Sequence, residues 1–528
     1  MIIAFALAVI LRIYPTLYYH EPFSTDSWQP IRNAQVLLAD TPTQLAGNPA
    51  FDQYNIYWPA NSIFGAIASL VFNAVPIQVM PLVFPIIGSV TVLIFFIIAE
   101  RLTKSSLAAF IASVIFASAG FYATFTSSIT KETFANPIYM MCLYFLVARK
   151  VDLKTVFLFG VTSFVLILAH YATMFVFLPI AGSIVVADFV LSLKRGEQLG
   201  AKIFLPVVTG LVALGYITLY GYAGLEGIPG QIDASTWVEL LSFLVVMMVP
   251  VIYFVVGPKR KMIPLEELIV MGAFVVALVI ASRTNVIPLA PVLPQWIYLL
   301  IVPYLIVGAF AIFGYRILQR EDRRSFAFVG AWLSSVVALE GFAFLSGISG
   351  GIGVTYRLFD FLYPPAAILG AVAFSKLYTL NRGAIMKIGL ASLVIIIVSV
   401  SAYQTYGAAI ERQNLLGGHW AYTQAEYAGA SWVSANHPVG GFDLSGDTHV
   451  SYLYSGYFGM NVTSGGGYAF LSGLSNAEPK NLVTYSLMAQ NGYVLDPYAF
   501  PIESNWLSNL EGNSSLVFSN GNVMFWDP

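Results

Sequence analysis

Apolar runs of about 18 or more residues recur along most of this chain, and they limit its fold more than any other feature. A run of that length forms a helix that crosses the hydrocarbon core of a bilayer. The runs are continuous rather than alternating, which argues against a transmembrane β-barrel. Only 10% of the 528 residues are charged, against about 25% in a soluble domain. The chain is therefore predicted to be an α-helical polytopic membrane protein, and a soluble enzyme is excluded.

The net charge and the cysteine content remove two further classes. The formal net charge is -2, with no basic face that would collect phosphates, so we expect no nucleic-acid partner. Cys142 is the only cysteine and lies in an apolar run, which excludes an intramolecular disulfide and predicts a packing role.

Thirteen membrane spans are predicted from these runs. They cover residues 1–19, 80–99, 107–124, 135–149, 155–170, 172–193, 201–221, 235–256, 265–283, 297–316, 325–345, 359–376 and 386–403. We interpret the first as a membrane helix rather than a cleaved signal peptide, because no basic segment precedes it. An odd number of spans puts the two ends of the chain on opposite sides of the membrane.

Most of the 25 Lys and Arg residues fall in alternate loops of this arrangement. The positive-inside rule assigns such loops to the cytoplasm. The N-terminus is then cytoplasmic and the C-terminus outside. The basic loops are 101–104, 149–154, 194–202, 259–261, 316–324 and 376–387.

One further apolar run, residues 60–76, could be another span. If it crossed, the following basic loops would lie outside and the charge pattern would invert. We therefore interpret it as an interfacial helix within a long outer loop, residues 20–79.

The composition changes after residue 403, where the apolar runs stop and Gly, Ser, Asn and Tyr become frequent. We predict a transmembrane domain over 1–403 and a small extracytoplasmic α/β or α+β domain over 404–528. Asn520-Gly521 between two apolar stretches predicts a β-hairpin. Residues 426–436 are typical of a short helix.

The first outer loop carries an acidic cluster immediately after the first span. Asp26 could be a general base or a metal ligand, or it could simply cap a helix over 27–39. Tyr57 and Trp58, later in the same loop, could stack on a sugar or belong to the aromatic belt of the interface.

The second outer loop, residues 124–137, contains only two charges, Lys131 and Glu132. Glu132 is either a solvated interfacial acid or a second acid that faces Asp26 across one cavity.

Two other polar residues lie at predicted outer ends of spans. His170 could bind a phosphate or be a hydrogen-bonded packing residue. Arg357 closes a Gly-rich loop and could hold a phosphate bidentately or extend to the interface. Arg12, inside the first span, should face protein or water rather than lipid.

The tail also holds a loose acidic and histidine cluster made of Asp443, Asp447 and His449. It resembles a metal site only in composition, and we expect an Asx-type turn before a strand instead.

Together these residues resemble the integral-membrane GT-C glycosyltransferases, most of all the catalytic subunit of bacterial and archaeal oligosaccharyltransferases. The Asp-x-Trp/Tyr-x-x-x-Arg motif of that family is matched by Asp26, Trp28 and Arg32, and Tyr57-Trp58-Pro59 matches its Tyr-x-Pro-like stretch. Thr130-Lys131-Glu132 occupies the place of an Asp-x-Asp/Glu pair. The arginine that opens the penultimate span corresponds to Arg357.

Two departures from the family pattern bear on the reaction. Thr130 replaces the first acid of the pair, which removes a metal ligand, and the tail lacks the Trp-Trp-Asp-Tyr-Gly motif that reads the acceptor sequon, with Asp447 only a loose counterpart. A related glycosyltransferase with another acceptor fits these changes better than Asn glycosylation.

The resemblance implies transfer of a sugar or oligosaccharide from a polyprenyl-phosphate-type lipid to a glycan, lipid or protein acceptor at the outer face of the plasma membrane. It implies that Asp26 and Glu132 are catalytic and could share a divalent cation (Mg or Mn). The implied phosphate-binding residues are Arg357, His170 and Lys131, and the implied acceptor- or sugar-binding residues are Trp28, Arg32, Tyr57 and Trp58. A flippase or transporter of lipid-linked sugars, or a non-catalytic protein of surface-glycan assembly, is the alternative.

Overall fold

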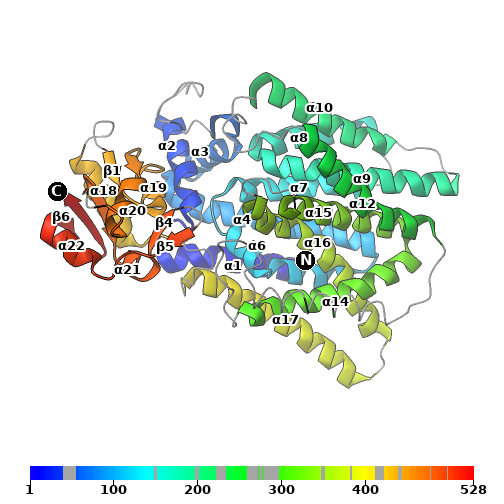
Figure 1. The fold of residues 1–528 in the computed structure, drawn as a ribbon. Coiled ribbons are helices and arrows are strands. Elements are labelled where there is room, and N and C mark those ends of the chain that lie inside the picture. Colours follow the sequence, from blue (N-terminus) through cyan, green and yellow to red (C-terminus); the bar gives the residue numbers. More distant parts are fainter. Residues whose placement is uncertain are drawn as a thin grey trace. The chain divides into compact units, whose positions relative to one another are not determined.

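The structure of the chain is a computed structural model. It describes residues 1–39, 51, 55–147, 151–196, 201–221, 234–257, 272, 276, 297–345, 351–380, 383–410, 421–437, 443–475, 477, 479–495 and 498–527. Figure 1 shows the elements of this part of the chain.

The chain divides into two compact units, each of which is described by itself. The helical unit consists of residues 1–11, 87–123 and 134–405. The loop–tail unit consists of residues 12–86, 124–133 and 406–528, so it combines the first predicted outer loop, part of the second and the tail. The sequence assigned these three segments to the same side of the membrane.

Long apolar helices account for most of the chain (Figure 1). Among the described residues, nine of them are long and apolar enough to cross a membrane, as expected of a multi-pass membrane protein. The helices in the predicted span regions are α1 (Ile2–Tyr19), α4 (Pro76–Thr103), α5 (Ser106–Ala117), α7 (Lys131–Val147), α8 (Leu153–Ala169), α9 (Tyr171–Arg195), α10 (Phe204–Tyr216), α12 (Ala234–Val256), α14 (Ile297–Glu321), α15 (Arg323–Leu345), α16 (Gly351–Leu380) and α17 (Ala384–Ile410). Apart from residues 272 and 276, the predicted span 265–283 lies outside the described residues.

The predicted span 107–124 is not one helix. α5 ends at Ala117, where the Ser118 hydroxyl donates to the Ile115 carbonyl at 3.2 Å, and a second short helix, α6 (Gly120–Phe125), follows. The apolar run continues across the break because residues 115–120 are all buried in protein, and composition alone does not reveal that turn.

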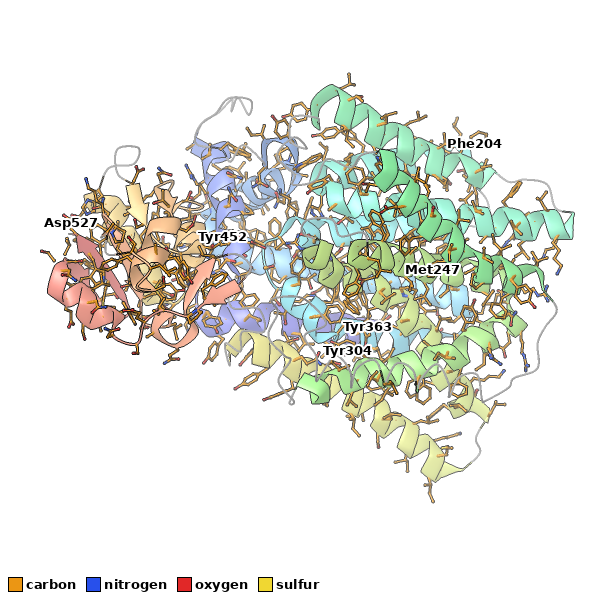
Figure 2. All side chains as sticks on the ribbon, viewed as in Figure 1. Phe204, Met247, Tyr304, Tyr363, Tyr452 and Asp527 are labelled. Atoms are coloured by element: carbon orange, nitrogen blue, oxygen red, sulfur yellow. The ribbon has the colours of Figure 1, made fainter. Side chains whose placement is uncertain are left out.

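The helices of the helical unit pack closely where glycines face a neighbouring backbone. α14 packs against α16, and a Cβ on Gly314 would lie 1.7 Å from the Leu369 carbonyl oxygen, so only glycine permits this approach. Nearby, the rings of Tyr304 and Tyr363 lie 5.2 Å apart on the same two helices (Figure 2).

The carbonyls at the C-terminal end of α12 have partners from other helices. Gln319 Nε2 donates to the Phe254 carbonyl at 3.0 Å, and Arg323 donates to the Gly257 carbonyl at 3.0 Å. Lys194 donates to the Val256 carbonyl. Cations at this end also complement the negative end of the helix dipole.

The run 60–76 forms a helix too short to span a bilayer, α3 (Ala60–Phe72). It packs against α2 (Trp28–Ala39), and it ends at Asn73, which adopts the left-handed conformation with φ 48°. Leu70 and Val71 are exposed, whereas Asn61, Ser62 and Ser69 are buried. The helix therefore has an outward apolar face, which agrees with the expected amphipathic character; its place at the interface remains a prediction.

The tail folds as a small α+β structure. Its five-stranded sheet has the order β2-β1-β3-β7-β6, in which the first three strands are parallel and the rest antiparallel. The strands are β1 (Asp443–Ser445), β2 (Asn461–Thr463), β3 (Leu482–Tyr485), β6 (Ser515–Ser519) and β7 (Val523–Asp527), with a separate pair β4 (Tyr493–Leu495) and β5 (Tyr498–Phe500). The helices are α18 (Gln424–Asn436), α19 (Thr448–Tyr454), α20 (Gly465–Leu471), α21 (Met488–Asn491) and α22 (Trp506–Asn513).

Two local predictions for the tail are confirmed. β6 and β7 form an antiparallel hairpin around Asn520-Gly521, where Gly521 has φ 84° and Asn520 Oδ1 accepts from the Val523 N–H at 2.9 Å. The helix expected over 426–436 is α18, which begins with a capping box between Thr423 and Glu426.

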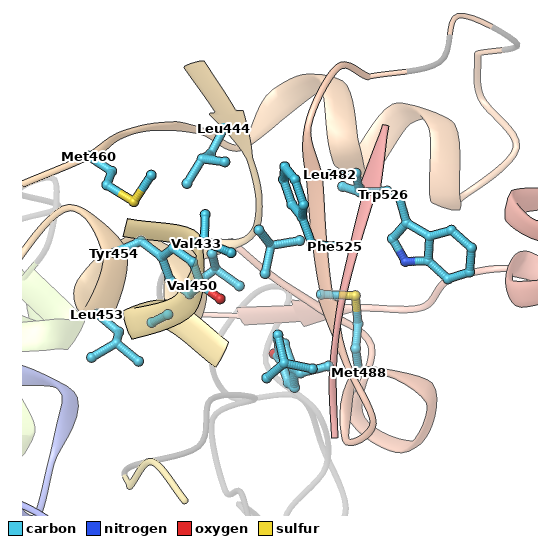
Figure 3. Close-up of a cluster of buried hydrophobic side chains, with 14 of the residues drawn as sticks. Val433, Leu444, Val450, Leu453, Tyr454, Met460, Leu482, Met488, Phe525 and Trp526 are labelled. Atoms are coloured by element: carbon cyan, nitrogen blue, oxygen red, sulfur yellow. The ribbon is translucent and has the colours of Figure 1, made fainter. Parts of the chain in front are cut away.

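The tail core lies between α18, α19 and the sheet (Figure 3). Leu444, Val450, Leu482 and Phe525 are each at most 3% exposed. The indole N–H of the equally buried Trp526 donates to Thr484 Oγ1 at 2.9 Å, so its one polar atom is satisfied.

The Asx-type turn before a strand that was expected at Asp447 and His449 is wrong, because a helix and not a strand follows Asp447, and both residues have structural roles in this core. Asp447 follows β1 and caps α19: its carboxylate accepts from the Val450 N–H at 2.9 Å, from the Val494 N–H at 3.1 Å and from the Tyr485 hydroxyl at 2.6 Å. His449 Nε2 lies 3.1 Å from Glu426 Oε1. Asp443 is exposed on β1, so the three residues do not form one cluster of side chains.

The tail core predicts that truncating a side chain on β7 destabilises the sheet much more than truncating one on the neighbouring β6. Phe525→Ala should destabilise the sheet by about 3–5 kcal/mol, because it removes a large buried ring. Hydrogen exchange of the β3 and β7 peptides in the full-length protein should therefore become much faster. Leu516→Ala on β6, where the side chain is half exposed, is the matched control and should change exchange little. Equal effects of the two changes would contradict this core.

Candidate functional site

Asp26 lies in a short turn that several hydrogen bonds and a β-bridge hold in place. The turn is a 3-10 helix, Thr25–Ser27, preceded by Ser24 with φ 78°, a left-handed conformation that is rare for serine. The Ser24 hydroxyl accepts from the Asp26 N–H at 3.3 Å. The Ser27 hydroxyl donates to the Phe23 carbonyl. Phe23 in turn pairs with Ala421 in an isolated β-bridge. Strained backbone that its surroundings hold in place is characteristic of functional positions.

The second loop segment is joined directly to this turn. The Ile129 N–H donates to the Ser27 hydroxyl at 2.9 Å. Ser27 is adjacent to Asp26 in the chain and Ile129 is three residues before Glu132, so this bond brings the two predicted acidic segments together. Neither acid could be placed relative to the other from the sequence.

The polar residues of the second segment are almost completely buried. Thr124, Thr126, Ser127, Ser128 and Thr130 are all at most 5% exposed. Thr126 Oγ1 accepts from Arg12 Nε at 2.7 Å, and Arg12 itself has no exposed surface. Arg12 therefore faces protein, as expected for an arginine inside a span, and the sequence did not indicate its partner.

Glu132 lies in the first turn of α7 and is 7% exposed. Thr130 Oγ1 accepts from the Thr133 N–H at 3.1 Å and lies 2.8 Å from Thr133 Oγ1, so the residue that replaces the acid of the family motif caps this helix. A carboxylate in the first turn is favoured by the positive end of the helix dipole. Lys131, next to it, is partly exposed.

Trp28 is completely buried and has a packing role. Its ring stacks on Tyr427 at a centroid distance of 5.4 Å and meets Tyr422 and Tyr457 edge-on at 5.6 and 5.3 Å. The three tyrosines belong to the tail, and Trp28 is part of the tail's hydrophobic core. Its ring faces are thus occupied by protein, which anchors the first loop to the tail.

Arg32 on α2 binds the tail in the same region. Its Nη1 donates to the Ser455 carbonyl at 3.1 Å. Its guanidinium also covers Gly459, where a Cβ would lie 2.7 Å from Nη2 and where φ is 75°. One turn later, Gln35 Nε2 donates to the Tyr457 hydroxyl at 3.0 Å. The motif residues Trp28 and Arg32 therefore position the Asp26 turn on the tail.

Tyr57 and Trp58 lie at the entry to α3. Trp58 has no exposed surface, whereas Tyr57, at the end of the 3-10 turn Asn55–Tyr57, is partly exposed. Of this pair, Tyr57 is the one with a surface that a ligand can contact.

Glu21 belongs to the acidic cluster that follows the first span, and its electrostatics differ from those of an ordinary surface acid. Partial burial raises the pKa of its carboxyl to about 7, and its charge acts on Tyr427 of the tail. Burial, followed by the charges of Glu426, Asp447 and, more weakly, Asp26, raises the pKa of Tyr422. Asp26 and Glu21 thus each act electrostatically on a tyrosine at the start of the tail, and a carboxyl group with a pKa near 7 is suited to proton transfer at neutral pH.

His170 and Arg357 belong to the helical unit. His170 separates α8 from α9 and is 5% exposed; its Nδ1 accepts from the Thr173 N–H at 3.3 Å, so it caps α9. The expectation that Arg357 closes a Gly-rich loop is wrong, because α16 already begins at Gly351 and contains Arg357. It is partly exposed there, three residues before the buried Asp360.

Seven of the nine predicted site residues thus belong to the loop–tail unit: Asp26, Trp28, Arg32, Tyr57, Trp58, Lys131 and Glu132. Throughout the described ranges, no three His, Cys, Asp or Glu side chains are grouped closely enough to hold a metal ion. The residues therefore do not form a complete metal site by themselves.

No protein-family model and no curated protein sequence matches the chain. Solved structures do resemble it. Archaeal oligosaccharyltransferase AglB from Archaeoglobus fulgidus, in complex with an inhibitory peptide and a dolichol-phosphate, superposes with a TM-score of 0.59 at 14% identity, over 92% of this chain and 69% of AglB. The same oligosaccharyltransferase in complex with Zn and sulfate gives a TM-score of 0.59 at 14% identity, over 92% and 68% of the two chains.

ArnT from Cupriavidus metallidurans, bound to undecaprenyl phosphate, gives a TM-score of 0.50 at 13% identity. The match covers 99% of this chain and 97% of ArnT. AglB and ArnT are both GT-C glycosyltransferases. The chain therefore has the GT-C fold that the motifs of the first outer loop predicted.

The packing of Trp28 among three tail tyrosines predicts that this side chain holds the first loop against the tail. Trp28→Ala should cost about 3–5 kcal/mol of local stability, because it empties a fully buried site. Hydrogen exchange should then increase in both partners of the contact, residues 20–39 and 455–460. Trp237→Ala, at an exposed position of α12, is the tryptophan control. Unchanged exchange in Trp28→Ala would show that the anchor does not hold the loop.

The raised pKa of Glu21 predicts a pH-dependent stability. Its folded-state pKa of about 7 exceeds the ordinary value of 4.5, so the folded protein binds the proton more tightly and loses stability as pH rises from about 4.5 to 7. The thermal midpoint of Glu21→Gln, relative to the unmodified protein, should therefore rise from pH 5 to 7 and then level off. Glu511→Gln, at an exposed carboxyl of α22, is the control. A pH-independent difference for Glu21→Gln would contradict the raised pKa.

Proposed function

We propose that this protein is a glycosyltransferase that moves a sugar or oligosaccharide from a polyprenyl-phosphate-type lipid to an acceptor at the outer face of the plasma membrane. The GT-C fold supports the reaction class. AglB and ArnT, which share that fold, were captured with dolichol-phosphate and undecaprenyl phosphate respectively. A lipid phosphate donor is the ligand class common to the two.

The observation that carries the proposal is the braced turn at Asp26. Ser24 is held at φ 78°, and Ser27 is bonded to Ile129 of the segment that leads to Glu132. A merely solvated acid at a membrane interface needs neither a strained backbone nor a bond from a second loop. A carboxylate that must be held at one position for catalysis needs both.

In the proposed reaction Asp26 orients the acceptor and removes its proton as the acceptor attacks the anomeric carbon. The bond from that carbon to the phosphate oxygen breaks, and the lipid phosphate leaves with the bonding electrons. Glu132, held at the start of α7, orients the acceptor. The proton then passes from Asp26 to water.

Arg357, His170 and Lys131 are proposed to bind the phosphate of the donor. The arginine suits two phosphate oxygens at once. Nδ1 of His170 is engaged by Thr173, so the contact of His170 is assigned to Nε2. These cations would stabilise the negative charge that grows on the leaving phosphate.

The aromatic and basic residues of the first loop divide into two roles. Tyr57 is proposed to contact the sugar or the acceptor. Trp28 and Arg32, which are engaged by the tail, and the buried Trp58 are proposed to position the loop rather than to touch substrate. The acceptor is a glycan, a lipid or a protein.

Asp26→Asn tests the proposal directly. Loss of a positioned general base should slow transfer by about 10²–10⁴-fold, measured as sugar release from a radiolabelled polyprenyl-phosphate sugar by the purified full-length protein. Asp443→Asn, at an exposed acid of β1, should leave the rate unchanged.

Two results would count against the proposal. Full activity of Asp26→Asn would remove Asp26 from catalysis. Absence of any sugar release by the unmodified protein, together with movement of the intact lipid-linked sugar across vesicle membranes, would favour a flippase instead.

A further inference from the structure

The helical unit contains a cavity of about 270 Å³ that the proposed reaction does not use. Its wall takes residues from the ends of α4, α7 and α9, from the start of α15, and from the 3-10 turn Ala201–Ile203. These segments include three of the basic loops, 101–104, 194–202 and 316–324. The three loops therefore meet at one end of the helical unit, as their alternation along the chain predicts.

The residues that line the cavity carry a net positive charge. Its described cations are Arg101, Lys104, Arg195, Lys202 and Arg324. The acids among the same lining residues are Asp188 and Asp322. Five cations against two acids give these residues a formal charge of +3, in a chain whose net charge is -2.

Both acids are engaged by specific partners. Asp188 lies 3.0 Å from Arg324 Nε and 3.6 Å from Lys202 Nζ. Asp322 lies 2.5 Å from Lys104 Nζ and accepts from the Arg324 N–H at 3.1 Å. These bonds hold three of the cations in place without balancing the total charge.

Arg101 is held by an aromatic ring rather than by an acid. Its guanidinium carbon lies 4.3 Å from the centre of the Tyr144 ring, and Nη2 donates to the Tyr144 hydroxyl at 2.7 Å. An arginine fixed in this way keeps other donors for a ligand with several oxygens.

Apart from Ser325, the remaining wall is apolar. Leu102, Leu146, Ile184, Val185 and Phe328 contribute to it, and they lie on helices that continue into the bundle. Cations beside an apolar wall suit a ligand in which a negatively charged group is attached to glycerol or to an apolar group. The volume is just below the lower limit of about 300 Å³ for pockets that enclose drug-sized ligands, so it suits a single headgroup and not an oligosaccharide.

We propose that this cavity binds a phosphate group, either the headgroup of an anionic phospholipid or a small soluble phosphate. The charge distribution assigns its loops to the cytoplasm, whereas Asp26 and Glu132 lie on loops assigned to the outer side. The site is therefore separate from the proposed donor site and does not depend on the transfer reaction.

The test uses the purified full-length protein and three probes: short-chain phosphatidylglycerol, short-chain phosphatidylcholine and inorganic pyrophosphate. Binding is measured by isothermal titration calorimetry and by native mass spectrometry. Preference for phosphatidylglycerol over phosphatidylcholine would identify a lipid headgroup, and binding of pyrophosphate would identify a soluble phosphate. Either result supports the site if the binding weakens with added salt and in the double variant Arg101→Gln, Arg195→Gln.

The double variant Arg101→Gln, Arg195→Gln lowers the formal charge of the described wall from +3 to +1. It should weaken binding by about tenfold or more, since each lost charge-assisted hydrogen bond is worth about a factor of ten. The matched control, Lys154→Gln with Lys387→Gln, removes two cations from other basic loops outside the wall and should bind as the unmodified protein does. Arg101→Lys with Arg195→Lys keeps the charge and should recover part of the affinity.

Three outcomes would overturn the proposal. One is equal affinity of the unmodified protein for the anionic and zwitterionic lipids without binding of pyrophosphate. Another is equal weakening by the control pair, which would indicate general attraction to a basic surface. The third is unchanged binding in the Arg101→Gln, Arg195→Gln variant. If that variant does not fold, the lipid and salt comparisons on the unmodified protein still decide the question.

Discussion

The loop–tail unit depends on the burial of one side chain, Trp28. Its indole is enclosed by Tyr422, Tyr427 and Tyr457 of the tail, so a residue two positions after Asp26 belongs to the core of a domain that begins almost 400 residues later. Of the large rings in the first outer loop, Trp28 is the one that belongs to the hydrophobic core of the tail. Packing this ring into the tail supports the turn that contains Asp26, next to the positive-φ conformation of Ser24.

Hydrogen bonds then fix the relative positions of segments that hydrophobic burial brings together. The Ile129 N–H and the Ser27 hydroxyl connect the two acidic segments, and Arg12 connects the first span to Thr126. These groups are buried, and a buried polar group without a partner costs about 1–3 kcal/mol. The second segment therefore has few alternative conformations, which explains why a stretch rich in Ser and Thr is buried rather than solvated.

The same family motif contains residues of different roles. In Asp26-x-Trp28-x-x-x-Arg32 the acid is partly exposed at the turn, the tryptophan is buried in the tail core, and the partly exposed arginine donates to a carbonyl of the tail. Thr130 stands where the family that the chain resembles carries an acid, and its hydroxyl caps α7, the helix that holds Glu132 in its first turn. A motif therefore indicates where a site lies, but contacts decide which of its residues can meet a substrate.

The sequence by itself determined the membrane class, most of the long apolar helices, a short helix within the run 60–76, the hairpin at Asn520-Gly521 and the helix α18. These features follow from local hydrophobicity, charge and turn chemistry, which act over a few residues. The break after Ala117, the inclusion of Arg357 in α16, the capping by Asp447 and the anchor at Trp28 were decided only by the tertiary structure. Each depends on a partner that is distant in sequence or on competition between neighbouring hydrogen bonds, and a residue's own type does not specify either.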